Sequence, residues 1–110
     1  MPRVIKEPYK FIEVRKDLTE TDDEMKSGKL HVYGYKPTFL NTGTVILFIN
    51  NRALKPGDQW HDAVPEHCPI DTEYDIVIGQ DLVGQPDVAG LVAKPGTWVR
   101  VSYYLKVSEN

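Results

Sequence analysis

Apolar and polar residues alternate with a period of two along several stretches of this chain, which is the pattern of half-buried β-strands. The longest alternation is Thr97–Val107, where Val99 and every second residue after it share one face. Shorter alternations cover Tyr9–Arg15, Lys29–Tyr35 and Thr72–Gly79. We therefore predict a β-strand over each of these four ranges.

The stretch from Asn41 to Trp60 predicts a strand, a hairpin and a turn. Val45–Ile49 is the longest uninterrupted apolar run, and its β-branched residues favour a strand buried on both faces. Asn50-Asn51 follows it, and asparagine tolerates the left-handed conformation of a tight two-residue hairpin. Pro56-Gly57-Asp58 then predicts a second turn, which leads into a strand over Gln59–Val64.

Three segments interrupt the β pattern. Asp17–Gly28 predicts a loop with at most a short helix, because Thr21 and Glu24 have the spacing of a capping box. Lys36-Pro37 is expected to end the second strand, because proline cannot donate to a sheet. Gln80–Gly96 is rich in glycine and proline and predicts mostly loop.

These elements predict an all-β fold, a single antiparallel β-sandwich of the immunoglobulin or jelly-roll type. The 110 residues suffice for one domain with a sizeable core. We assign residues 9–110 to the sandwich and residues 1–8, with their two prolines, to an extended N-terminal arm. The inward-facing positions predict a core of Val45, Leu47, Ile49, Ile76, Ile78, Val99, Val101, Tyr103 and Leu105.

Charge is distributed unevenly along the chain, although its net value is only −3. Residues 1–16 hold five basic and two acidic residues, whereas residues 58–87 hold eight acidic residues and no lysine or arginine. Such an acidic surface repels phosphate, so we expect no nucleic-acid partner. Met1–Lys10 lacks the apolar core of a signal peptide, and no apolar run could span a bilayer, so we expect cytoplasmic synthesis and no membrane partner.

Residues with catalytic or metal-binding chemistry are present but poorly arranged for either role. His61, Asp62, Glu66 and His67 are of types that ligate zinc or iron, yet the second histidine that a cupin places two positions after its first is missing. The acidic residues do not form a calcium loop, and the single Cys68 has no base on its own face of an extended chain. We therefore expect no metal site, no cofactor and no enzymatic activity.

Aromatic residues supply the candidate contact surface. Trp98, Arg100 and Tyr104 lie on the face of the last predicted strand opposite its valines, a composition typical of protein interfaces. Trp60, Tyr33 and Tyr35 could join them and stack on a sugar ring. A face that is simply covered by other parts of the protein would have the same composition.

The pattern N-x-G-x-V-x-x-x-I-N-N-x-x-L-x-P-G-D-x-W, from Asn41 to Trp60, resembles small β-sandwich structural proteins of bacteriophage particles, such as capsid decoration proteins and trimeric head fibres. The resemblance covers about twenty residues. It implies self-assembly and docking on a capsid lattice, and it carries over no catalytic residue.

Two hypotheses follow from the sequence. In the first, the protein is a non-enzymatic structural component of a virion that contacts other copies and other structural proteins through the aromatic face and through Arg3, Val4, Ile5 and Lys6 of the arm. In the second, it is a ligand-binding module for carbohydrate or a divalent metal. The expected location is the virion, and the cytoplasm is the alternative.

Overall fold

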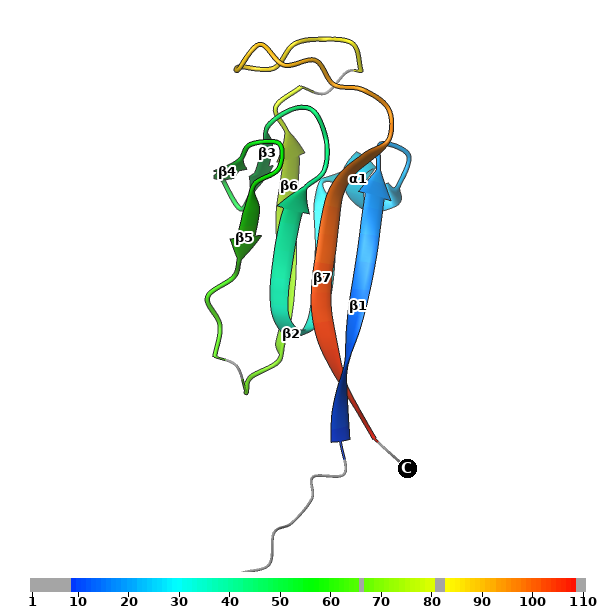
Figure 1. The fold of residues 1–110 in the computed structure, drawn as a ribbon, viewed down its shortest axis with the longest axis vertical. Coiled ribbons are helices and arrows are strands. Elements are labelled where there is room, and N and C mark those ends of the chain that lie inside the picture. The colour runs from blue at the N-terminus through cyan, green and yellow to red at the C-terminus, as the bar shows by residue number, and fades with distance from the viewer. Residues whose placement is uncertain (1–8, 66, 81–82, 109–110) are drawn as a thin grey trace, which may run out of the picture.

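The computed structural model describes residues 9–65, 67–80 and 83–108, and Figure 1 shows their arrangement. Every strand pairing in this part of the chain is antiparallel. The elements are β1 (Tyr9–Thr19), α1 (Asp23–Ser27), β2 (Lys29–Asn41), β3 (Leu47–Ile49), β4 (Arg52–Leu54), β5 (Gln59–His61), β6 (Ile70–Ile78) and β7 (Thr97–Ser108). Among the described residues, no helix has the length and apolar character that crossing a membrane requires.

The strands form one seven-stranded sheet in the order β1-β7-β2-β6-β3-β4, with β5 also paired to β2. This sheet is folded over on itself within β2. Tyr74 is the cross-strand partner of Leu30, and in a straight strand Leu30 would lie about 30 Å from Phe39. The rings of Tyr74 and Phe39 are nevertheless only 4.7 Å apart.

The folded sheet has two layers, as Figure 1 shows. One layer contains β1, β7, β5 and the second half of β2, and the other contains the first half of β2, β6, β3 and β4. The predicted all-β, antiparallel sandwich is therefore confirmed. Both layers belong to one continuous sheet because β2 takes part in each of them.

The bend in β2 corrects the expectation that Lys36-Pro37 would end this strand. Lys36 adopts a left-handed backbone, with φ of 53°, and the pairing with β7 shifts register between Tyr35 and Thr38. Pro37 is buried, and its carbonyl accepts a hydrogen bond from the backbone N–H of Asp62 at 3.2 Å. The missing N–H of proline is tolerated at such a bulge, so the strand turns and continues to Asn41.

The core lies between the two layers and agrees largely with the predicted one. Leu30 and Val32 point inward while His31 and Tyr33 are exposed, as their alternation predicted. Of the predicted core residues, six are buried (Val45, Leu47, Ile49, Ile76, Val99 and Val101), and three are only half-buried (Ile78, Tyr103 and Leu105).

The predicted hairpin and turn are confirmed by backbone geometry. Asn50 and Asn51 both have positive φ, 49° and 67°, and join β3 to β4. Gly57 has φ of 87° in the following turn. The apolar run before the hairpin forms a shorter strand than predicted, since β3 includes only Leu47–Ile49. Phe48 is half-buried, whereas the prediction placed both faces of this strand in the core.

The short helix α1 occurs within the predicted loop, but Thr21 does not cap it. Asp22 is the N-cap residue, and its carboxylate accepts a hydrogen bond from the backbone N–H of Thr19 at 2.7 Å. Gly28 ends the helix in a left-handed conformation, with φ of 73°.

The described part of the loop between β6 and β7 is organised by Asp87. This carboxylate accepts hydrogen bonds from the backbone N–H groups of Ile46, Ala89 and Leu91 at 2.7, 2.9 and 3.1 Å. The bond from Ile46 is the main reason why the pKa of Asp87 lies below its ordinary value. Asp87 thus joins this loop to the segment that precedes β3.

Candidate functional site

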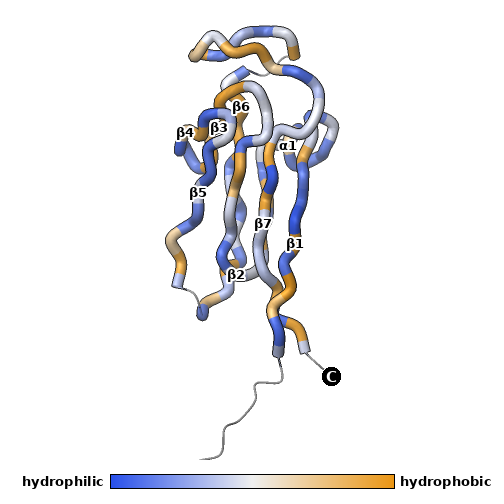
Figure 2. Tube along the Cα trace, viewed as in Figure 1, coloured by the Kyte–Doolittle hydropathy of each residue, from blue (hydrophilic) through white to orange (hydrophobic). Residues whose placement is uncertain are grey.

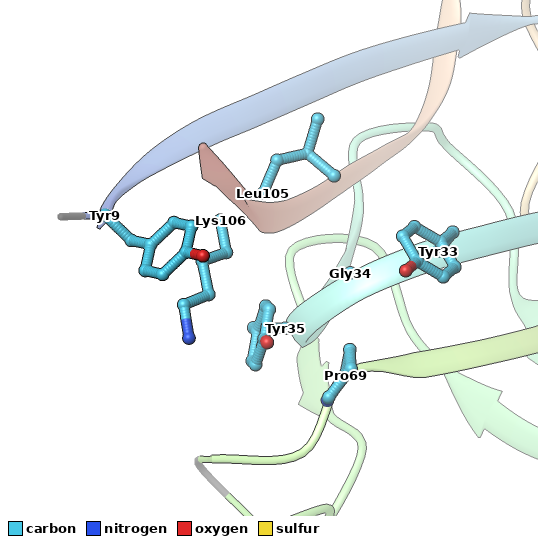
Figure 3. Close-up of a pocket in the computed structure, with 7 residues that line it drawn as sticks. All are labelled: Tyr9, Tyr33, Gly34, Tyr35, Pro69, Leu105 and Lys106. Atoms are coloured by element: carbon cyan, nitrogen blue, oxygen red, sulfur yellow. The ribbon is translucent and has the colours of Figure 1, made fainter. Parts of the chain in front are cut away.

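The candidate site is a cleft at the end of the sandwich where β1 begins and β7 ends. Its volume is about 320 Å³. Figure 3 shows Tyr9 and Lys106 on one side of it and Tyr33, Tyr35 and Pro69 on the other. We call it the tyrosine cleft, and its lining residues are Tyr9, Tyr33, Gly34, Tyr35, Pro69, Leu105 and Lys106.

One wall of the tyrosine cleft depends on the bend in β2. Gly34 lies between the two tyrosines of this strand, with φ of 158°. A Cβ atom at Gly34 would lie 2.7 Å from a ring carbon of Tyr103 and 2.7 Å from the carbonyl oxygen of Tyr104. Only glycine therefore lets β2 approach β7 this closely. Pro69 joins the same wall because the next residue, Ile70, pairs with Gly34.

The other wall is formed by the paired ends of β1 and β7. The ammonium nitrogen of Lys106 lies 4.7 Å from the ring centroid of Tyr9, which is a cation–π geometry. Beside the cleft, the ring of Phe11 contacts Tyr35 edge to face, with centroids 5.1 Å apart. This contact links β1 to β2.

Much of this aromatic surface remains accessible to solvent. Tyr9, Phe11 and Tyr33 are 47%, 53% and 58% exposed, respectively. We call these three residues, together with Tyr35, the aromatic end. Figure 2 shows hydrophobic residues in orange along this end of β1 and β7. Large accessible aromatic residues that lie together are characteristic of binding surfaces.

The side chains that line the tyrosine cleft can make stacking and polar contacts. Its lining side chains, all in the described part of the chain, supply three phenol hydroxyls and one ammonium group and include no carboxylate, imidazole or thiol. Tyrosine rings offer flat faces for stacking, and their hydroxyls can donate or accept hydrogen bonds. The cleft can therefore hold a side chain or a small ring by stacking and a few polar contacts.

Two predicted metal candidates lie in a second, smaller pocket of about 210 Å³. His61 Nδ1 is 3.0 Å from the hydroxyl of Thr38, and Asp62 accepts a hydrogen bond from the hydroxyl of Tyr74. Burial and then this hydrogen bond raise the pKa of Tyr74 above its ordinary value. Both candidate ligands thus have partners within the protein.

Of the other two metal candidates, His67 does not line this second pocket. His67 is exposed, and Glu66 lies outside the described residues. Within residues 9–65, 67–80 and 83–108, no three histidine, cysteine or acidic side chains are arranged to hold a metal ion.

Trp98 corrects the predicted aromatic face. It is only 5% exposed, and its indole N–H donates to the carbonyl of Lys94 at 2.8 Å. The register explains this burial: Leu18 pairs with Val99 and Thr19 with Thr97, so Trp98 is the extra residue of a β-bulge. Its expected exposure is therefore wrong, because the bulge breaks the alternation on which that expectation depended.

The remaining predicted surface residues do not form one cluster. Trp60 is half-buried, with its ring stacked on Phe39 at 5.5 Å and the guanidinium of Arg52 4.8 Å from its centroid. Arg100 donates to the carboxylate of Asp17 at 2.8 Å. The structure therefore separates these two residues from the tyrosine cleft.

Three predicted residues do come together. Tyr33 and Tyr35 line the tyrosine cleft, and Tyr104 lies next to it as the cross-strand partner of Tyr35. The arm residues Arg3, Val4, Ile5 and Lys6 lie outside the described part of the chain.

Sequence reasoning missed the contribution of β1 and the end of β7 to this site. The available signal was a repeated pattern, because Tyr9 and Phe11 are two residues apart on one predicted strand, as Tyr33 and Tyr35 are on another. Two aromatic pairs at a spacing of two residues place rings on one face of each strand. That signal does not show that the two strands lie near each other.

Comparisons with family models, with curated proteins and with solved structures find no match for this chain.

Proposed function

We propose that this protein is a non-enzymatic structural component of a larger assembly and that it docks on other proteins through the aromatic end. The observation that carries the proposal is that Tyr9, Phe11 and Tyr33 are each about half exposed at one end of the sandwich. Tyrosine is enriched at protein interfaces because it buries a large area while losing little conformational freedom. The proposed partners are other copies of this chain and other structural proteins.

A more specific proposal is that the assembly is a bacteriophage particle, which would place the protein in the virion. Its support is the resemblance of Asn41–Trp60 to small capsid decoration and head-fibre proteins. In the structure this stretch begins at the last residue of β2 and includes all of β3 and β4 and the first two residues of β5. It therefore belongs to the framework of the sandwich, whereas the aromatic end provides the contact.

The experiment compares two exposed apolar residues. Phe11→Ser removes a ring of the aromatic end, and Val77→Ser changes a residue of similar exposure, 54%, on β6. Both variants are expected to fold, because neither side chain is part of the core. Particles are purified on a density gradient from cells that carry the gene and are probed with an antibody against this protein.

The wild-type protein and Val77→Ser are expected to sediment with the particles at a fixed ratio to the shell protein, and Phe11→Ser is expected to be depleted at least about tenfold. If the wild-type protein stays in the soluble fractions, the virion proposal is wrong. If Phe11→Ser and Val77→Ser sediment equally, the aromatic end is not the docking surface.

The tyrosine cleft favours a second candidate function, carbohydrate binding. Its volume of about 320 Å³ lies near the lower end of the range for small-molecule pockets, about 300–1,000 Å³. Tyr33 and Tyr35 supply rings on which a sugar could stack. Titration with a panel of oligosaccharides, followed by NMR, should shift the tyrosine signals of the wild-type protein but not of Tyr35→Ala. Unchanged spectra across the panel would reject this function.

A further inference from the structure

The strand β1 has an open edge. It is the terminal strand of the sheet order, is eleven residues long and pairs with β7 along its whole length. Figure 1 shows it at the outer side of its layer. In the described part of the chain, no strand pairs with its other edge. A long open edge is a template for another strand unless its side chains prevent pairing.

The backbone groups that point to this open edge can be identified by following the hydrogen bonds across the sheet. Asn41 bonds to residues on the β5 side through both its N–H and its carbonyl, so its neighbour Leu40 faces β7 and pairs with Arg100. Residues Val99 and Val101 of β7 must then face β1, since successive residues of a strand point to opposite neighbours.

The partners of these two valines in β1 are Leu18 and Lys16. The even-numbered residues of β1 therefore bond to β7, and the odd-numbered residues present their N–H and carbonyl groups to the open edge. Thr19 agrees with this assignment, because its N–H bonds to Asp22 and not to β7. Phe11, Glu13, Arg15 and Asp17 are consequently the residues that another strand would meet.

We propose that β1 pairs in antiparallel orientation with β1 of a second copy, around a twofold axis that passes between the two Val14 residues. This inference rests on the proposed function, in which the protein contacts other copies of itself, and names the surface and the register of that contact. It extends the sheet of each copy across the dimer. A twofold contact of this kind is closed, so it makes a dimer. Tyr33 and Tyr35 of each aromatic end belong to β2 and lie outside this contact.

The charges of β1 select this register. With Val14 at the axis, Glu13 of each copy faces Arg15 of the other, which gives two opposite-charge cross-strand pairs. Phe11 faces Asp17, and each such pair can exchange two backbone hydrogen bonds.

Neighbouring registers are less favourable. An axis at Glu13 would place two carboxylates opposite each other, and an axis at Arg15 would oppose two guanidinium groups as well as Glu13 and Asp17. An axis at Ile12 brings no opposite charges face to face and uses a shorter part of the strand. Charged residues on an edge normally discourage pairing with arbitrary strands, and here their order is complementary to itself.

The first test is charge reversal. Glu13→Arg places arginine opposite arginine in the dimer, and Arg15→Glu places glutamate opposite glutamate. Both side chains are substantially exposed, at 43% and 55%, so the fold should be retained, which circular dichroism can check. Each single variant is expected to raise the dimer dissociation constant by about tenfold or more, measured by sedimentation velocity over a dilution series.

Mixing the two variants gives a sharper result. One copy then carries two arginines and the other two glutamates at these positions, so an equimolar mixture should form the dimer that neither variant forms alone. The double variant Glu13→Arg/Arg15→Glu should also dimerise, because the exchange preserves complementarity. A mixture that remains monomeric, or single variants that dimerise as well as the wild type, would overturn the proposal.

A cysteine at the axis tests the register directly. Val14→Cys in a Cys68→Ser background should form a disulfide-linked dimer under mild oxidation, because facing residues that are not hydrogen-bonded have Cα atoms about 4.5 Å apart. Lys16→Cys in the same background is the matched control, because its two copies would lie about 13 Å apart. Equal cross-linking of the two variants would contradict the register.

The outcomes separate this inference from the function on which it rests. A wild-type protein that joins particles but stays monomeric in solution at concentrations up to about 1 mM overturns the β1 contact and leaves the structural function standing. A dimer that responds to these substitutions but never joins particles supports the β1 contact and rejects the proposal that the protein is a virion component.

Discussion

Replacing Gly34 with alanine is expected to lower the free energy of unfolding by about 3–5 kcal/mol. The added methyl group would lie 2.7 Å from a ring carbon of Tyr103 and 2.7 Å from the backbone oxygen of Tyr104. The tyrosine ring could rotate away, but the carbonyl belongs to the β7 backbone. Relief therefore requires that β2 and β7 move apart where the tyrosine cleft forms.

Two costs contribute to this magnitude. Forcing an extra carbon into a closely packed place typically costs about 1–3 kcal/mol. A side chain at φ of 158° adds backbone strain, which typically costs a further 1–3 kcal/mol or so. The middle of the two ranges adds to about 4 kcal/mol.

Gly96→Ala separates these two costs. Gly96 also has a positive φ, 132°, but a Cβ there would meet no atom within 4 Å. This control should show the strain alone and so destabilise the protein about 1–3 kcal/mol less than Gly34→Ala does.

Urea unfolding can measure both variants, with the fluorescence of the two packed tryptophans as the signal and linear extrapolation to water. If Gly34→Ala costs no more than Gly96→Ala, the close approach of β2 to β7 is not what fixes the bend, and the reasoning fails.

Three further predictions concern the core and its hydrogen bonds. Leu47→Ala should lower the free energy of unfolding by about 2–5 kcal/mol, because this side chain is only 1% exposed; thermal unfolding measures it. Asn41→Asp should destabilise the protein at least as much as Asn41→Ala at neutral pH. The side-chain amide of Asn41 donates to the carbonyls of Val45 and Leu54, each at 2.8 Å. A carboxylate would face both carbonyls without a proton to donate. The lowered pKa of Asp87 means that its stabilising effect is complete above its ordinary value of 3.8 and is lost as the pH falls below that value towards the folded pKa. The melting temperature of Asp87→Asn should therefore be lower than that of the wild type at pH 7, and the difference should shrink in acid; a constant difference would contradict this assignment.

The sequence by itself determined the features that depend on neighbouring residues. Asn50-Asn51 predicted the hairpin because few residues other than glycine and asparagine accept positive φ at two successive positions. The alternation of Leu30 and Val32 with His31 predicted which side of β2 is buried, because successive side chains of any strand point to opposite faces. These rules need no knowledge of which strand lies next to which.

The candidate site was predicted only in part, because the alternation along one strand does not show how that strand pairs with its neighbours. Tyr33 and Tyr35 were recognised as outward aromatic residues, and both line the tyrosine cleft. Trp98 was assigned to the wrong side because a bulge opposite Leu18 and Thr19 interrupts the alternation. A bulge is a property of two paired strands, so the pattern of one strand cannot reveal it.

Only the tertiary structure decided that β2 folds over and that its bend lies against β7. Glycine is required at position 34 because Tyr103 and Tyr104 lie where a Cβ atom would be placed. These two tyrosines are about seventy residues further along the chain. The same long-range packing brings the beginning of β1, the bend of β2 and the end of β7 together as one aromatic surface. Local preferences act over a few residues, whereas the site is created by contacts between segments at opposite ends of the sequence.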